Sequence, residues 1–186
     1  MLNIFKRTLF LLLALPTITA LSQTQTPTNL GSVVNSSARD AEPTFTADGQ
    51  TMYFNCFDRE GEEGSDICVS HLEGEDWGEP SIVWEVSTRE HLEVEPLLSP
   101  DGQQLYIMSN RPGGKGGMDI WVSDYVDGKW SSPTNLDAPI NSAYADHCLY
   151  FSGDDWEIAY WLSLIHISEP TRRRGISYAV FFLKKK

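Results

Sequence analysis

Short apolar runs alternate with turn-forming residues through the middle of the chain, and the pattern is clearest from Glu95 to Trp130, EPLLSPDGQQLYIMSNRPGGKGGMDIWVSDYVDGKW. Asp101-Gly102 stands between two apolar runs. This pair is typical of a hairpin turn, because Gly adopts positive φ at little cost and Asp tolerates it. The pattern predicts four short strands, at about residues 95–99, 104–108, 119–124 and 132–136. Outside the first 22 residues, no stretch has capped helical periodicity.

The same pattern recurs with a period of 53 residues. Glu42-Pro43 recurs as Glu95-Pro96, and Asn29 and Asn35 match Asn135 and Asn141 at twice the offset. A third copy begins near residue 148 and stops at residue 161. We interpret the shared positions as structural residues of the repeat; they include Asp48, Gly49, Asp66, Trp77, Asp101, Gly102, Arg111, Asp119, Trp121 and Trp130.

A four-stranded unit that repeats every 40 to 50 residues or so is typical of a propeller blade. The sequence therefore predicts an all-β fold, a β-propeller fragment with about two and a half four-stranded antiparallel blades. The predicted boundaries are a signal peptide at 1–22, an N-terminal segment with the closing strand of a blade at 23–41, blades at 42–94 and 95–147, a partial blade at 148–161, and a non-native tail at 162–186.

The first 22 residues predict a secretory signal peptide. Lys6 and Arg7 precede the apolar run Leu9 to Leu15, and Ala20-Leu21-Ser22 has the small residues of a cleavage site. The apolar run is shorter than the roughly 20 residues that span a bilayer. The leader therefore predicts export to the periplasm or the medium of a bacterium, with no stable membrane span after cleavage.

The last 25 residues, LSLIHISEPTRRRGISYAVFFLKKK, break both the repeat and the acidic character of the chain. Their segment SLIHISEPTR resembles the conceptual translation of sequencing-adapter DNA. The resemblance implies that the tail is not part of the natural protein and that the gene is truncated within a repeat. The alternative is a basic tail that binds anionic partners.

Without leader and tail, the segment from Gln23 to Trp161 holds 25 acidic and six basic residues, a formal charge of −19. A surface this acidic repels nucleic acid and anionic membranes. All six tryptophans lie in the same segment, which favours an ordered aromatic core over disorder.

Two stretches, SPDGQQLYIMSNRPGGKGGMDIWVS and DGKWSSPTNLDAPINS, resemble the TolB-type, WD-repeat-like β-propeller repeat of exported bacterial proteins. FTADGQTMYF and FSGDDWEIAYW are weaker copies, so the resemblance extends from about Asn29 to Trp161. It implies a propeller fold but no single activity, because such modules include periplasmic scaffolds, partners of peptidoglycan-binding domains and parts of hydrolases. Since propellers close with about four to eight blades, the chain is expected to be part of a larger ring.

The loop Gly113-Gly114-Lys115-Gly116-Gly117-Met118-Asp119 has two ligand-binding interpretations. A calcium-binding nonapeptide repeat would recur every nine residues, and a phosphate loop would precede a helix, whereas this loop precedes a predicted strand. We favour a tight structural loop in which Asp119 accepts backbone N–H bonds and pairs with Arg111.

A second loop is acidic, and carboxylate oxygens are ligands that Ca²⁺ prefers. Its weak calcium candidates are Asp58, Glu60, Glu62, Glu63 and Asp66. The alternative is a solvated charged loop, and no cofactor is otherwise predicted.

Cys56 and Cys68 fall on neighbouring predicted strands, so a disulfide between them is possible in an exported protein. Cys148 is the odd cysteine, and the histidines do not fall at metal or catalytic-triad spacings. No Gly-x-Ser-x-Gly nucleophile elbow is present. Trp77 and Trp130 occupy equivalent positions and are interpreted as packing residues rather than sugar platforms.

These observations favour an exported, non-catalytic propeller module that binds or scaffolds a protein or a cell-envelope polymer through its interblade loops. The alternative is the propeller portion of a secreted hydrolase, a peptidase or a glycan-active enzyme, whose catalytic part lies elsewhere. A sugar-binding propeller is a third possibility.

Overall fold

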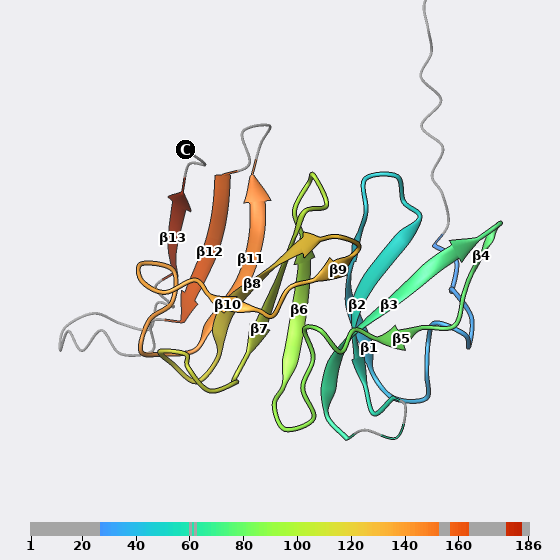
Figure 1. Ribbon diagram of the computed structural model, residues 1–186, viewed down its shortest axis with the longest axis horizontal. Coiled ribbons are helices and arrows are strands. Elements are labelled where there is room, and N and C mark those ends of the chain that lie inside the picture. Colours follow the sequence, from blue (N-terminus) through green and yellow to red (C-terminus); the bar gives the residue numbers. More distant parts are fainter. Residues whose placement is uncertain (1–26, 60, 62, 153–156, 164–177, 184–186) are drawn as a thin grey trace, which may run out of the picture.

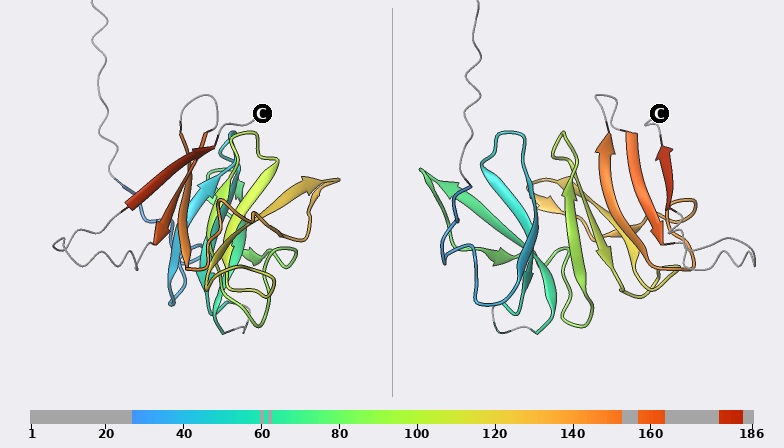
Figure 2. Two further views of the ribbon diagram at one scale, coloured as in Figure 1. Left: turned by 90° about the vertical axis from the view of Figure 1, so that its left-hand side faces the viewer. Right: turned by 180° about the vertical axis from the view of Figure 1, so that it is seen from behind.

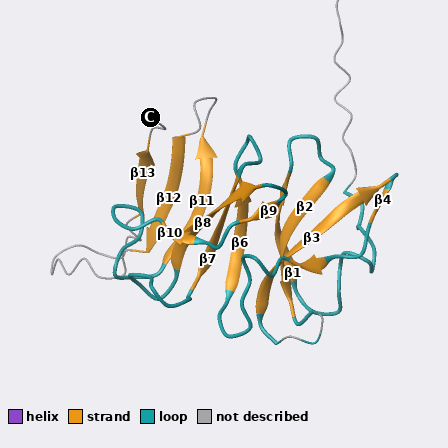
Figure 3. Ribbon diagram, in the orientation of Figure 1, coloured by secondary structure: helices purple, strands orange, loops and turns teal. Residues whose placement is uncertain are grey.

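The computed structural model describes residues 27–59, 61, 63–152, 157–163 and 178–183, and this part contains strands and no helix (Figure 3). The strands form three antiparallel sheets that follow one another along the chain (Figure 1). The prediction of an all-β propeller fragment is confirmed.

The first sheet has the strand order of a blade. Its strands are β1 (Asp40–Phe45), β2 (Thr51–Phe57), β3 (Ser65–Glu73), β4 (Asp76–Trp77) and β5 (Ser81–Ile82), and both β4 and β5 pair with β3. The fourth strand of the blade is thus broken in two. Pro80 lies at the break, and a proline cannot donate a backbone hydrogen bond to a sheet.

The second sheet repeats this arrangement. It contains β6 (Glu93–Leu98), β7 (Gln104–Ser109), β8 (Asp119–Val126), β9 (Lys129–Trp130) and β10 (Thr134–Asn135). β9 and β10 both pair with β8, with Pro133 between them. The four predicted strands correspond to β6, β7, β8 and β10, while the short strand β9 was not expected.

The third sheet contains β11 (Asp146–Ser152), β12 (Glu157–Ser163) and β13 (Tyr178–Leu183). β13 pairs with β12 along its whole length, so the third sheet includes residues from the tail that sequence reasoning set aside. The segment YAVFFL is rich in aromatic and β-branched residues, which favour strands.

The two Asp-Gly pairs make identical turns. Gly49 and Gly102 have φ values of 69° and 70°, where a residue without Cβ is favoured. The carboxylate of Asp48 accepts a hydrogen bond of 2.6 Å from the hydroxyl of Thr46 and one of 3.0 Å from the backbone N–H of Gln50. The carboxylate of Asp101 does the same at 2.6 and 3.1 Å. These bonds explain why the pair recurs.

The main core lies between the first two sheets, which pack face to face (Figure 2). Successive side chains of β2 and of β7 point to opposite faces of their sheets, so every second side chain faces the neighbouring sheet. The first sheet and the segment after it contribute Tyr53, Ile67, Val83 and Val86, and the second contributes Leu98, Leu105, Ile107, Trp121 and Trp130. A similar cluster joins the second sheet to β11 through Leu149 and Phe151.

Candidate functional site

The loops gather at two ends of the sheets. The loops that join the second and third strands, residues 58, 59, 61, 63 and 64 in the first sheet and 110–118 in the second, lie at one end of the sheets. The segments 83–92 and 136–145, which cross to the next sheet, lie at the same end (Figure 1, lower edge). We call this the crossing-loop end. An ion pair of 3.0 Å between Lys115 and the exposed Asp137 joins two of these segments.

The Gly-rich loop folds around the carboxylate of Asp119. Asp119 is 1% exposed. Its carboxylate accepts hydrogen bonds from the backbone N–H groups of Lys115 and Gly116, and one of 2.9 Å from the side-chain amide of Asn135. A Cβ at Gly114 would collide with this carboxylate, and one at Gly116 would collide with the carbonyl of Tyr144. Close packing therefore accounts for two of the glycines without a ligand.

Arg111 does not pair with Asp119, so that part of the prediction is wrong. Its Nη2 lies 2.9 Å from Oε1 of Glu93, and it also donates to the carbonyl of Val86. The reason is the strand register: Ser109 lies opposite Glu93, so an arginine two residues later is directed to the start of β6. Glu93 is fully buried, and the hydroxyl of Ser109 donates to it at 2.8 Å.

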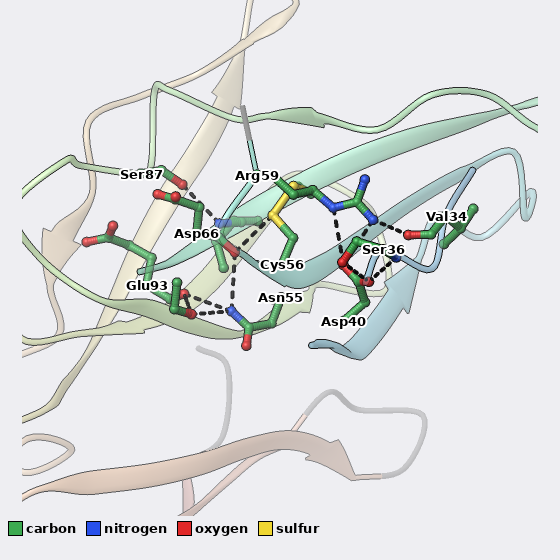
Figure 4. The surroundings of a disulfide bond; sticks show 12 residues. Val34, Ser36, Asp40, Asn55, Cys56, Arg59, Asp66, Ser87 and Glu93 are labelled. Carbon is green, nitrogen blue, oxygen red and sulfur yellow. Dashed lines mark hydrogen bonds and ion pairs between the residues drawn. A yellow bond between two sulfur atoms is a disulfide. The ribbon is translucent and has the colours of Figure 1, made fainter. Parts of the chain in front are cut away.

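The first sheet contains the same arrangement (Figure 4). Arg59 Nη2 lies 3.0 Å from Oδ1 of Asp40 and donates to the carbonyl of Val34. The backbone N–H of Ser36 donates to the other oxygen of Asp40 at 2.6 Å. An acid at the start of the inner strand is thus joined to an arginine and to the crossing segment that precedes it.

The third sheet keeps the acid but has no arginine beside it among the described residues. Asp146 is fully buried and accepts bonds of 2.6 Å from the N–H and 3.0 Å from the hydroxyl of Ser142. Burial raises the pKa of Asp146, the bonds from Ser142 oppose that shift, and the nearby Asp119 adds to it.

Sequence reasoning missed these acids, although Asp40, Glu93 and Asp146 are 53 residues apart. Their partners Arg59 and Arg111 are 52 apart, because Arg59 lies three residues after Cys56 whereas Arg111 lies two residues after the equivalent Ser109. A comparison that allows a shift of one position within this loop would have matched both arginines.

A second carboxylate series joins the inner strands. Glu42 Oε2 accepts the backbone N–H of Glu95 at 3.1 Å, and Glu95 Oε2 accepts that of Cys148 at 2.9 Å. All three residues have positive φ, at 56°, 51° and 56°, where a bulge interrupts the strand pairing.

Burial, followed by the charge of Glu95, raises the pKa of the Cys148 thiol. His147 Nδ1 lies 3.9 Å from Glu95 Oε1.

The acidic loop does not assemble as a cluster in the part that the structure describes. Asp58 is exposed and accepts the N–H of Gly64 at 3.0 Å, whereas Asp66 is buried on β3. Glu60 and Glu62 lie outside the described residues, and the described residues contain no group of three possible metal ligands. Calcium binding stays a prediction.

Cys56 and Cys68 form a disulfide between β2 and β3, with their Cα atoms 5.8 Å apart (Figure 4). Cys56 lies opposite Asp66, so the bond joins diagonal rather than opposing positions. Cys148 is the free cysteine of the described residues.

Trp121 and Trp130 lie in the core between the first two sheets. Trp130 is 7% exposed, and its Nε1 donates to the hydroxyl of Tyr53 at 3.3 Å. Trp121 donates to the carbonyl of Ser109 and lies under the guanidinium of Arg111. Both indoles are engaged in packing between strands, and neither forms an exposed sugar platform.

No protein-family model matches the chain, and no curated protein matches it. Among solved structures, a protein described as TolB from Agrobacterium tumefaciens is 20% identical, with a TM-score of 0.56 over 81% of this chain and 47% of that one. TolB from Acinetobacter baumannii is 19% identical, with a TM-score of 0.48 over 77% of this chain and 29% of that one. A puromycin-hydrolyzing peptidase from Mycobacterium tuberculosis is 18% identical, with a TM-score of 0.47 over 69% and 19%.

The chain thus spans about half the length of the Agrobacterium protein. This likeness confirms a TolB-type β-propeller fold. Nowhere in the described ranges is a helix long and apolar enough to cross a membrane.

Proposed function

We propose that this chain is part of an exported, non-catalytic β-propeller module that binds a protein or a cell-envelope polymer at its crossing-loop end. The observation that supports this proposal is a contrast between acids that are buried inside the sheets and large side chains that are exposed on the crossing segments. The buried acids Asp40, Glu93 and Asp119 are bonded within the sheets and the segments between them. The segments that cross between sheets instead expose large side chains to solvent.

Three such side chains lie on the crossing segments. Trp84 is 39% exposed, Leu92 43% and Tyr144 44%. The guanidinium of Arg89 stacks over Trp84 at 4.8 Å from the ring centroid. Trp, Tyr and Arg are the residues that most often dominate the binding energy of protein interfaces, so this end is suited to a macromolecular partner.

The charge of the chain favours the same class of partner. With 25 acidic and six basic residues between 23 and 161, the module repels nucleic acid and suits a basic protein segment. The predicted signal peptide, residues 1–22, on which the proposed export rests, lies outside the described residues.

Site-specific photo-crosslinking tests this proposal. A benzophenone amino acid replaces Trp84 at the crossing-loop end or Tyr125, which is 41% exposed near the opposite turns, in protein exported to the periplasm. We expect adducts with an envelope protein or with peptidoglycan from position 84 and not from position 125. Equal yields from both positions, or none from position 84, would contradict the proposal.

Sedimentation with purified peptidoglycan sacculi separates the two classes of partner. Fluorogenic peptides and glycosides, incubated with the same protein, test the alternative of a hydrolase. Turnover above that of a heat-treated sample would replace the binding module with an enzyme.

A further inference from the structure

Each crossing segment ends in a short loop that is closed by the acid at the start of the next inner strand. A serine or threonine at the beginning of the loop donates two hydrogen bonds to that acid, one from its backbone N–H and one from its hydroxyl. Because the acid is itself bonded inside the sheet, the loop is fixed at both ends. The three pairs are Ser36 with Asp40 at 2.6 and 2.8 Å, Thr88 with Glu93 at 2.8 and 3.2 Å, and Ser142 with Asp146 at 2.6 and 3.0 Å.

The loop that enters the second sheet, residues 88–93, differs from the other two, and we call it the middle loop. Its acid follows its threonine by five residues instead of four, so the loop contains one residue more. Its base is fixed to β7 and to the loop after β7, since Glu93 also accepts hydrogen bonds from Ser109 and Arg111. A loop that is held in this way loses little conformational entropy when it binds a partner.

The exposed side chains of the middle loop do not follow the 53-residue repeat. The turns and the closing acids recur in every copy because the fold depends on them. An exposed side chain that does not recur has no such role in the fold, and exposed loop positions on a rigid scaffold commonly serve recognition. Counted back from the closing acid, the counterparts of Glu90 are Ser37 and Ala143, and those of Leu92 are Arg39 and Ala145.

Leu92 lies where three loops meet. A Cβ built at Gly64, in the loop after β2, would lie 4.0 Å from the Cδ2 atom of Leu92. The backbone N–H of Leu92 donates to Oδ1 of Asn110, in the loop after β7, at 2.9 Å. These loops lie side by side at the lower edge of Figure 1. The leucine side chain is nevertheless 43% exposed, so an apolar group stands open to solvent at this junction.

Negative charge borders Leu92 on two of these loops. Glu63 directly precedes Gly64, Glu90 lies on the middle loop, and both glutamates are exposed. In the part of the chain that the structure describes, no cation forms an ion pair with either carboxylate. The cation of the middle loop, Arg89, lies over a tryptophan ring at 4.8 Å from its centroid. The charge beside the leucine is therefore not neutralised by the chain itself.

The equivalent junction, between the second and third sheets, has different chemistry on the same frame. Gly116 packs there against the carbonyl of Tyr144, in the crossing segment. The charge on that loop is Lys115, which pairs with Asp137 at 3.0 Å. One junction thus presents an apolar side chain beside open carboxylates, and the next presents a tyrosine beside a paired charge.

We propose that the junction around Leu92 recognises a basic polypeptide segment in which an apolar side chain lies between lysines or arginines. This proposal rests on the proposed function of the crossing-loop end and names the chemistry of its partner. The apolar side chain of the segment covers Leu92, and the cations on either side of it pair with Glu63 and Glu90. An apolar centre with a charged rim is the usual anatomy of a protein interface, and the rim charges select the partner.

Fluorescence anisotropy with synthetic peptides tests this proposal on the purified chain. The probe is a fluorescein-labelled peptide of sequence GKKLKKG; one companion has serine for the leucine, and another has glutamate for the lysines. Two double variants of equal net charge separate the junction from the charge of the whole chain. Glu63→Gln with Glu90→Gln alters the junction, and Glu75→Gln with Asp127→Asn alters exposed turns after β3 and β8.

We expect the junction variant to bind the probe about threefold to thirtyfold more weakly than the parent chain, because each exposed ion pair contributes modestly. The turn variant should stay within about twofold of the parent. Leu92→Ser should weaken binding of the probe by about fivefold but leave binding of the serine peptide within about twofold, since only the probe loses an apolar contact. Tyr144→Ser, at the equivalent junction, is the matched control and should leave both affinities unchanged. The glutamate peptide should not bind.

Equal losses in the junction and turn variants would overturn the proposal, by assigning binding to the charge of the whole chain. A Leu92→Ser change that affects both peptides equally, or neither, would also overturn it. Crosslinks from position 84 to an envelope component, without binding of the probe, would refute the basic segment and leave the proposed function intact. If crosslinks and probe binding were both absent, the proposed function would fail as well.

Discussion

Replacement of Arg111 by methionine removes one charge from a buried pair. The side chain of Arg111 is 11% exposed and that of Glu93 is fully buried, with 2.9 Å between Nη2 and Oε1. Methionine keeps the apolar stem of the side chain but cannot donate to Glu93, to the Val86 carbonyl or to the Ser109 hydroxyl. The variant therefore leaves a buried carboxylate without a cation.

Removal of one partner from a buried pair costs about 3 to 5 kcal/mol. Glu93 keeps the N–H of Thr88 at 2.8 Å and the Ser109 hydroxyl at 2.8 Å, which compensate part of the charge. We therefore expect a loss near the lower end, about 3 kcal/mol. For a chain of this length, such a loss lowers the midpoint of thermal unfolding by roughly 6 to 12 °C.

Thermal unfolding followed by far-UV circular dichroism measures this loss. Addition of Glu93→Gln to Arg111→Met should recover most of it, because the remaining group is neutral. Lys115→Met is the control, since its pair with Asp137 is exposed and contributes about 1 kcal/mol or less. An Arg111→Met variant as stable as the Lys115→Met variant, or a double variant that recovers nothing, would refute the reasoning.

Three further predictions follow from single contacts. Replacement of Cys56 and Cys68 by serine should cost about 3 kcal/mol, because the bond closes a short loop in the unfolded chain; urea unfolding of the variant should match that of the parent under dithiothreitol. Gly116→Ala should destabilise by about 1 to 3 kcal/mol through its collision with a backbone carbonyl, whereas Gly117→Ala, which meets open space, should lie within about 0.5 kcal/mol of the parent by the same assay. Burial raises the pKa of Asp146 above its ordinary 3.8, so at this residue the folded chain binds more protons than the unfolded chain. The free energy of unfolding should therefore fall as the pH rises from the ordinary pKa of an aspartate through the raised pKa of Asp146. Asp146→Asn should flatten this dependence of stability on pH, and an unchanged dependence would exclude Asp146 as its source.

Much of the fold is accessible from the sequence because its signals are local. The turns at Asp48 and Asp101 need particular residues for a backbone reason, and each strand alternates because one of its faces meets a neighbouring sheet. The match of Asn29 with Asn135 also has a local cause. In both places the asparagine carboxamide oxygen accepts from the N–H two residues later and from a second asparagine six residues later.

The pairing of buried charges was harder to predict. Arg111 lies closer in sequence to Asp119 than to Glu93, and proximity along the chain favoured the wrong partner. The correct partner depends on the register of β6 with β7, which sequence spacing alone does not determine. The break in the fourth strand was also missed, because β9 is only two residues long and reads as part of a turn.

The period of the sequence arises from contacts between sheets as well as from turns within them. The bonds from Glu42 to the N–H of Glu95 and from Glu95 to that of Cys148 each span 53 residues, one full repeat. Glu95, in the middle of this series, accepts a hydrogen bond from the third sheet through its carboxylate and donates one to the first sheet through its backbone N–H. A change at one copy therefore alters two interfaces, as expected for a protein whose stability is a sum over neighbouring units. Cys148 keeps the backward bond through its N–H but has no carboxylate to offer forward, so the described series of carboxylate bonds ends at the third sheet.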